Sequence, residues 1–208
     1  MNINLDSNCV RFFEKDDRAF AAGTREISMY DSSLKGENAL LVPFGIQSFE
    51  GKECLKIILN DECKLKFTLF EGELVEKMKQ GIPIFLKDAG EYHSKISADF
   101  EGNTILKMAL SKDVKIEEYN VKKGTFSKLA NDQVPSGSKV SFGMKILHPW
   151  TLDIKGCSKY GVRIVITELI VYNDGEQKRK MTDSKLGIKE FMVSKSKKRT
   201  KLLEHKDL

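Results

Sequence analysis

Two segments near the end of the sequence, 138–147 and 161–172, show the alternation typical of half-buried β-strands, and this pattern limits the fold more than any other feature. In the first segment every second residue is apolar and would face a core: Val140, Phe142, Met144 and Ile146. Ser141, Gly143 and Lys145 would face the other way, because successive side chains of a strand point to opposite sides. The chain must therefore build its core on a β-sheet.

The second segment changes phase partway along its length. Its apolar residues alternate up to Ile166, and Leu169 and Val171 continue the same face only after one extra residue. An extra residue within a strand indicates a β-bulge, here near Thr167 and Glu168. Because a bulge lets a strand turn the corner of a barrel, we predict that this segment is the closing strand of a barrel.

Further strands are expected in the middle of the chain. Apolar or alternating runs bounded by turn residues predict strands at 39–47, 54–60, 64–70, 82–87, 95–100, 104–110 and 114–121. In the run 64–70, Lys64 and Lys66 would face outward from the core. The four residues NDEC, 60–63, would then close a hairpin between two of these strands.

One short amphipathic helix is predicted at 72–81, and a long polar connection at 123–137. Helical patterns do not alternate with the strands, which favours a barrel over a βαβ layout. We therefore expect a mainly β fold: a small barrel of about five or more antiparallel strands, closed or partly open, with a short helix and insertions. The barrel would occupy 39–173, the segment 1–38 would pack on it or on a partner, and 174–208 would form a basic tail.

Positive charge is concentrated at the end of the sequence. The formal net charge is +5, and residues 177–208 carry an excess of seven positive charges, which leaves the preceding 176 residues at −2. Any site for a polyanion on the barrel must therefore be a local patch. The tail would add phosphate contacts, act as a nuclear-localisation patch through 195–201, or serve as a flexible solubilising segment.

The sequence lacks the common local signatures of phosphate transfer, dinucleotide binding and hydrolysis. Its histidines are far apart and its four cysteines are irregularly spaced, so we expect free thiols, no metal and no cofactor. No apolar run is long enough to span a bilayer, and the start does not have the pattern of a signal peptide. We expect an intracellular protein without a membrane partner.

One fragment resembles part of an enzyme site. The run DECK, 61–64, brings together Asp61, Glu62 and Lys64. Two carboxylates can hold a magnesium ion while a lysine stabilises the attacking water or the phosphate, as in a metal-dependent nuclease. The alternative is a solvated turn, because charged residues are expected in a hairpin turn. We expect no catalysis and keep the nuclease as an alternative.

Between the two closing strands, the segment 148–160 is expected to be a loop that combines aromatic and basic residues. These residues, with the first basic residue of the following strand, are His148, Trp150, Lys155, Lys159, Tyr160 and Arg163. Exposed aromatic rings stack on unpaired bases for roughly 1 to 3 kcal/mol each, and nearby cations hold the phosphates. The alternative is structural: Trp150 would plug one end of the barrel and Tyr160 would cap the same core.

Residues 139–172, KVSFGMKILHPWTLDIKGCSKYGVRIVITELIVY, resemble the C-terminal barrel strands of single-stranded DNA-binding proteins from large DNA viruses and phages. In that family a strand, a short aromatic loop and a Y-G-[VI]-x-[ILV] strand close an OB-fold. The resemblance implies a protein that coats and protects unpaired DNA in replication, recombination or repair, with little sequence preference and without metal or catalysis. RNA as a ligand and a homo-oligomer stay open.

The resemblance also implies replication proteins as partners and a location at sites of DNA replication, in a cytoplasmic viral factory or the nucleus. Many members of the family end in an acidic tail, whereas this chain ends in the basic stretch 178–201. The mechanism of the acidic tail is therefore not carried over.

From these arguments we expect a DNA-binding groove lined by Trp150, Tyr160, Lys155, Lys159, Arg163, Lys145, Lys64 and Lys66. Binding would combine base stacking with neutralisation of phosphates, so affinity would fall as the salt concentration rises. Besides the nuclease, a structural or interaction protein with a basic nucleic-acid-binding tail remains an alternative.

Overall fold

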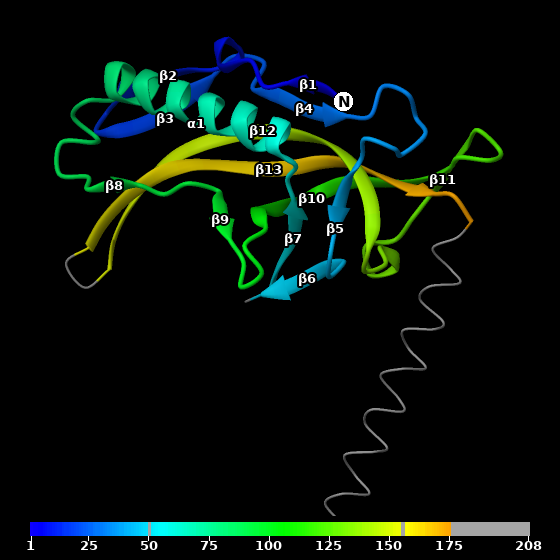
Figure 1. Cartoon of the computed structure of the whole chain (residues 1–208). Helices are drawn as coiled ribbons and strands as arrows, with labels where there is room; N and C mark the ends of the chain where they lie inside the picture. Colours follow the sequence, from blue (N-terminus) through cyan, green and yellow to red (C-terminus); the bar gives the residue numbers. More distant parts are fainter. Residues whose placement is uncertain (50, 155–156, 176–208) are drawn as a thin grey trace, which may run out of the picture.

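The computed structural model describes residues 1–49, 51–154 and 157–175. These residues form a mainly β structure with one α-helix, α1 (Asp61–Gly81), which lies across the barrel (Figure 1). The expected fold class is confirmed. No helix in this part of the chain is both long and apolar enough to cross a membrane. The predicted site residue Lys155 and the basic stretch 178–201 lie outside the described residues.

Five strands form a closed barrel. They are β5 (Leu40–Val42), β7 (Lys52–Ile58), β10 (Thr104–Asn120), β12 (Ser138–Ile154) and β13 (Cys157–Asn173). Around the ring, β5 pairs with β7, β7 with β10, β10 with β13, β13 with β12, and β12 with β5. The β10–β13 pair is parallel and the others are antiparallel. This Greek-key ring is that of an OB-fold.

The remaining elements are attached to this ring. The strands are β1 (Asn2–Asn4), β2 (Arg11–Lys15), β3 (Arg18–Ala22), β4 (Glu26–Tyr30), β6 (Ile46–Phe49), β8 (Glu91–Tyr92), β9 (Ile96–Ala98) and β11 (Thr125–Lys128), and the 3₁₀ helices are η1 (Ser7–Cys9) and η2 (Asn131–Gln133). The strand β4 pairs with β12 and carries β1 on its other side, whereas β2 and β3 form a separate hairpin. Of the N-terminal strands, β4 and β1 therefore extend the barrel sheet.

The predicted bulge is present in β13. Gly143 pairs with Glu168 and Met144 pairs with Ile166, which leaves Thr167 without a partner in β12. The residues predicted to face the core on these two strands are all buried: Val140, Phe142, Met144, Ile146, Val162, Ile164, Ile166, Leu169 and Val171. The alternation and its change of phase are therefore confirmed as features of the barrel core.

Part of the outer face of the barrel is covered by the loop after β4. Ser141 points away from the core, yet it is buried under this loop, and its hydroxyl accepts the Asp31 N–H at 2.8 Å. The Tyr172 hydroxyl lies 3.0 Å from the same Ser141 oxygen, and Gly36 packs against the Tyr172 ring. The loop therefore covers the outer face of the barrel around Ser141 and Tyr172.

The predicted strand 64–70 is wrong, because these residues belong to α1. Asn60 is the N-cap and its side chain accepts the Cys63 N–H at 2.8 Å, and Asp61 and Glu62 occupy the first turn, where acidic groups favour a helix. The buried residues of α1 follow the helical period: Cys63, Phe67, Phe70, Glu71, Leu74 and Met78. The predicted short helix is the second half of this longer one.

Alternation over only seven residues could not distinguish a strand from a helix. In the helix, Leu65 and Leu69 are 61% and 59% exposed, although the strand interpretation placed them in the core with Phe67. The residues NDEC begin the helix and do not close a hairpin. Lys64 and Lys66 are therefore exposed residues of α1 and not outward residues of a strand.

Two other predictions in the middle of the chain are wrong. The segment 82–87 forms turns and no strand, and 104–110 and 114–121 are parts of the single strand β10, whose register shifts between Leu110 and Lys115. The long connection at 123–137 contains β11 and η2. The strands predicted at 39–47, 54–60 and 95–100 correspond to β5 with β6, β7 and β9.

The expected loop at 148–160 is instead the outer half of a long hairpin. The pairing of β12 with β13 continues through Trp150 opposite Gly161 and Leu152 opposite Lys159 to Ile154 opposite Cys157. The hairpin projects beyond the barrel at the left of Figure 1. We call this outer half the hairpin arm. Its side chains alternate between two faces, and the face on which a side chain lies decides whether it can reach a ligand.

Candidate nucleic-acid interface

A groove runs across the outer face of the barrel. It consists of three neighbouring hollows of about 390, 460 and 370 Å³. The first two share His93 in their walls, and the second and third share Ser97. The hollows therefore adjoin one another in sequence, from the β12–β13 hairpin to the β9–β10 turn.

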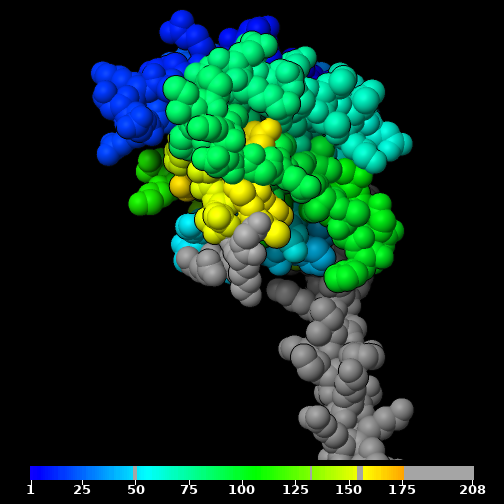
Figure 2. Space-filling model, turned by 90° about the vertical axis from the view of Figure 1, so that its left-hand side faces the viewer, coloured from blue at the N-terminus to red at the C-terminus, as the bar shows by residue number. Residues whose placement is uncertain are grey.

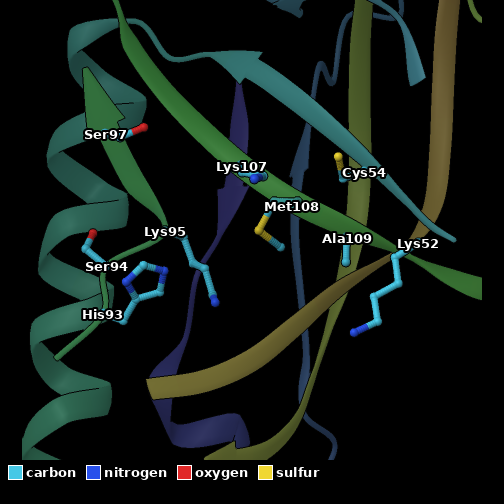
Figure 3. Close-up of a pocket in the computed structure, with 9 residues that line it drawn as sticks. All are labelled: Lys52, Cys54, His93, Ser94, Lys95, Ser97, Lys107, Met108 and Ala109. Carbon is cyan, nitrogen blue, oxygen red and sulfur yellow. The ribbon is translucent and has the colours of Figure 1, made fainter. Parts of the chain in front are cut away.

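The floor of the groove is formed by β7 and β10. On β7, Leu55 and Ile57 point inward and are fully buried, so the alternating residues Cys54 and Lys56 point outward. On β10, Lys107 lies opposite Lys56 and Ala109 lies opposite Cys54. Figure 3 shows Lys107, Met108 and Ala109 from β10 beside Lys52 and Cys54 from β7. The strand alternation thus puts two cross-strand lysines on the floor.

One wall of the groove is the segment 92–97, which runs between α1 and the barrel. The His93 N–H donates to the Tyr160 carbonyl at 2.7 Å, and the Lys107 N–H donates to the Lys95 carbonyl at 3.1 Å. These bonds tie the wall to β13 and to β10. Figure 2 views this end of the molecule and shows the hairpin in yellow against the green segment that follows α1.

Trp150 stands at the hairpin end of the groove. Its indole lies on Gly161, where an added Cβ would come within 2.7 Å of the ring. The His93 ring is 5.8 Å away at 61°, and the Lys95 ammonium is 5.7 Å from the indole centroid. Leu152, two residues along the same face, is 49% exposed. The arm therefore presents a half-buried aromatic ring with a cation beside it.

The opposite end of the groove also carries aromatic rings. Phe44 is 58% exposed and the Phe100 side chain is fully exposed, and both line the third hollow. The Lys56 ammonium is 5.7 Å from the centroid of the Phe44 ring. Each end of the groove therefore pairs exposed aromatic surface with a lysine.

The groove is positively charged. Its basic residues are Lys52, Lys56, Lys95, Lys107 and Lys159. Its acidic residues, Asp99 and Glu101, lie in the β9–β10 turn, where Asp99 accepts hydrogen bonds from within its own turn.

Two groups in the wall respond to this surrounding charge. The pKa of Lys95 is lowered, first by burial and further by Arg163, while Glu71 acts in the opposite direction. The pKa of His93 is lowered by burial and then by Lys95, Lys159 and Lys107. Because three neighbouring lysines contribute to the shift of His93, its ring lies in a positive potential that would attract an anion, whereas at Lys95 the effect of Glu71 is larger than that of Arg163.

Three of the predicted site residues lie at the groove. Trp150 and Lys159 line the hollow at the hairpin end. Arg163 is exposed, shares its strand face with Lys159, and is near enough to influence the Lys95 ammonium. The sequence therefore identified residues at the hairpin end of this groove, and their role in binding stays a prediction.

Other predicted residues lie elsewhere. Tyr160 is 7% exposed and packs on Tyr92 at 5.6 Å, on the face of β13 opposite Lys159, so its prediction as an exposed stacking residue is wrong. Lys145 is half-buried, pairs with Val165, and lines none of the three hollows. Lys64 and Lys66 are on α1, where the Lys66 ammonium binds the Glu62 carboxylate at 2.7 Å.

Most residues of the groove were not predicted from the sequence. The missed residues are Phe44, Lys52, Lys56, His93, Lys95, Phe100 and Lys107. Alternation within 54–60 and 104–110 could have marked Lys56 and Lys107 as outward residues of neighbouring strands. No local signal marks His93 and Lys95, because contacts with distant parts of the chain place them.

The fragment proposed as an alternative nuclease site forms the first turn of α1. Asp61 and Glu62 are exposed there, and Glu62 pairs with Lys66. Within the described ranges, no group of three His, Cys, Asp or Glu residues is arranged to hold a metal ion.

The fold and the groove together define an OB-fold protein with a basic and aromatic outer groove. The sequence matches no protein-family model and no curated protein. Among solved structures, the chain is similar to a C-terminal truncation of the single-stranded DNA-binding protein from bacteriophage Enc34, with 12% identity and a TM-score of 0.48 over 82% of this chain and 99% of that one. It is also similar to the same phage protein in complex with single-stranded DNA, with 12% identity and a TM-score of 0.47 over 80% and 97% of the two chains.

Proposed function

We propose that this protein binds single-stranded DNA in the groove between Trp150 and Phe44. The observation that carries the proposal is the groove itself: exposed aromatic surface at both ends and a row of lysines between them. In OB-folds, the second and third strands and the loops beside them form the nucleic-acid surface. Here those strands are β7 and β10.

Binding would combine two interactions. Bases would stack on Trp150, Phe44 and Phe100, at roughly 1 to 3 kcal/mol per base. Lysines on the floor, among them Lys56 and Lys107, would neutralise the phosphates that pass over β7 and β10. Both interactions are independent of base identity, so the protein would coat unpaired strands with little sequence preference, as replication, recombination or repair requires.

A preference for single strands follows from the aromatic groups. The faces of bases in a duplex are already stacked on their neighbours, so Trp150 and Phe44 could not reach them. The lysines would still attract a duplex, but without the stacking contribution.

The proposal is tested by fluorescence-anisotropy titration of a labelled oligonucleotide and of its duplex, over a salt series. We expect tighter binding of the single strand and a linear fall of log K with log salt. The five groove lysines and Arg163, each in contact with a phosphate, would give a slope of about −4, at roughly −0.7 for each contact with a single strand.

A chain ending at Asn173 separates the groove from the basic tail. This truncation keeps all of β13, so it should retain the preference for the single strand and lose only part of the affinity. If the truncated chain is folded and does not bind, or binds both forms equally, the groove is not the binding site and the proposal fails.

A further inference from the structure

A buried carboxylate on α1 is directed at the wall of the groove. Glu71 is 5% exposed, and none of the salt bridges among the described residues includes it. Its oxygens accept three hydrogen bonds: from the Tyr92 hydroxyl at 3.3 Å, the Ser94 hydroxyl at 2.5 Å and the Lys95 backbone N–H at 2.8 Å. All three donors belong to the segment that forms the wall.

The helix itself does not need this carboxylate to stay on the barrel. α1 already packs through Phe67, Phe70 and Leu74, which are buried in the main core. A buried acid is costly unless its oxygens are satisfied, and it adds little to helix packing. What Glu71 adds is a connection between the rigid helix and residues 92–95.

The wall segment depends on such connections. It follows a stretch of turns at 83–88 and contains only the two-residue strand β8 before β9 begins. His93 and Lys95 are bonded through the backbone to β13 and β10, while their side chains line the groove. The Lys95 ammonium then lies 5.7 Å from the Trp150 ring centroid. A shift of this segment would move Lys95 and the His93 ring relative to Trp150, which belongs to β12.

We infer that Glu71 is a positioning residue of the groove, which fixes residues 92–95 from α1 so that Lys95 is held beside Trp150 and His93 faces the bound strand. This inference rests on the proposed function, because it assigns the role of a residue that does not itself line the groove. The carboxylate also opposes the lowering of the Lys95 pKa by burial, so it helps Lys95 to stay charged. Glu71 thus acts mainly on the geometry of the wall through its hydrogen bonds, and its charge makes a smaller contribution.

The test compares Glu71→Gln and Glu71→Leu in the full chain, with Glu73→Gln as the control on an exposed acid of the same helix. The Gln side chain can accept the Lys95 N–H and donate to the Ser94 oxygen, so we expect affinity for single-stranded DNA within about twofold of the unmodified chain. Leu accepts no hydrogen bond, so we expect a loss of five- to twentyfold. The salt slope should also fall, because Lys95 no longer reaches a phosphate, whereas lower stability alone would leave the slope unchanged.

A second readout needs no DNA. The chain contains a single tryptophan, so acrylamide quenching of its fluorescence reports the exposure of Trp150 alone. Quenching should rise in Glu71→Leu and stay unchanged in Glu71→Gln and Glu73→Gln. If Glu71→Leu does not fold, Ser94→Ala removes the shortest of the three bonds from an exposed residue, and it should raise quenching as well.

The inference is overturned if folded Glu71→Leu binds and quenches like the unmodified chain, if Glu71→Gln loses as much affinity as Glu71→Leu, or if Ser94→Ala leaves quenching unchanged where Glu71→Leu cannot be folded. Failure of the proposed function looks different. The unmodified chain would then not bind single-stranded DNA, while the quenching measurements would still show whether Glu71 holds the wall against Trp150.

Discussion

The two faces of β7 and β10 differ in composition although they belong to the same strands. The inner face carries Leu55, Ile57 and Leu106, which are 0% exposed. The outer face carries Lys56 and Lys107, and over β7 and β10 it is left open as the groove. One face stabilises the barrel and the other is available for a ligand, so substitutions on the two faces should affect different measurements.

The largest effect is expected on the inner face. Leu106→Ala removes a fully buried side chain from β10 and should lower the free energy of unfolding by about 2 to 5 kcal/mol. Urea denaturation followed by circular dichroism measures this change. At a temperature where the variant remains folded, its affinity for single-stranded DNA should stay within twofold. A large loss of affinity in the folded variant would show that the two faces are not separable.

The next effect concerns stacking at the hairpin end of the groove. Trp150→Ala should weaken binding of single-stranded DNA by about 1 to 3 kcal/mol, which is roughly five- to 150-fold. Phe126→Ala is the matched control, since Phe126 is 48% exposed on β11 and lines none of the three groove hollows. Anisotropy titrations at one salt concentration compare the two. Equal losses in both variants would mean that Trp150 is not a specific contact.

A smaller effect is expected for a single lysine on the groove floor. Lys107→Gln should weaken binding by about three- to tenfold and reduce the magnitude of the salt slope by about 0.7, the contribution of one phosphate contact. The free energy of unfolding should change by less than about 0.5 kcal/mol, as for other surface substitutions. Lys123→Gln, at the exposed β10–β11 turn, should leave the slope unchanged. A slope unaffected by Lys107→Gln would place the phosphates elsewhere.

The difference between the buried and exposed faces of a strand also explains which parts of the fold could be predicted. The strands β12 and β13 were recognised because each has one face in the core, and this leaves a two-residue period in the sequence. Even the bulge at Thr167 was visible as a change of phase. The helix α1 was misread because Leu65, Phe67 and Leu69 happen to alternate. Its better signal was the N-cap Asn60 followed by two acids.

The prediction of a loop at 148–160 was wrong for a related reason. The residues between the two alternating segments were predicted to form a loop, and Trp150 and Tyr160 were both expected to line the groove. In a continuing strand, Trp150 and Tyr160 fall on opposite faces, so the groove receives Trp150 while Tyr160 packs on Tyr92. The wall segment 92–97 could not be predicted, because long-range contacts with Glu71 and with the strands β10 and β13 place it.

The smallest effect concerns the pH dependence of binding. His93 has a lowered pKa because of burial and of the nearby Lys95, Lys159 and Lys107, so its ring is mostly neutral at pH 7.5. A bound phosphate would stabilise the protonated ring, so binding would take up a proton. Affinity should therefore rise about two- to threefold between pH 7.5 and pH 5.5, beyond the change in His93→Gln. His148→Gln, an exposed histidine that lines none of the three hollows, should keep the pH dependence of the unmodified chain.

Stability should change in the opposite direction over the same pH range. Because the folded state lowers the His93 pKa, the unfolded chain binds this proton more readily. The contribution of neutral His93 to stability is therefore present above the ordinary histidine pKa, near 6.5, and is lost as the pH falls below it. Denaturation and DNA titrations of the unmodified chain and His93→Gln at both pH values would measure the two trends. If both quantities changed in the same direction because of His93, the ring would not face the bound strand.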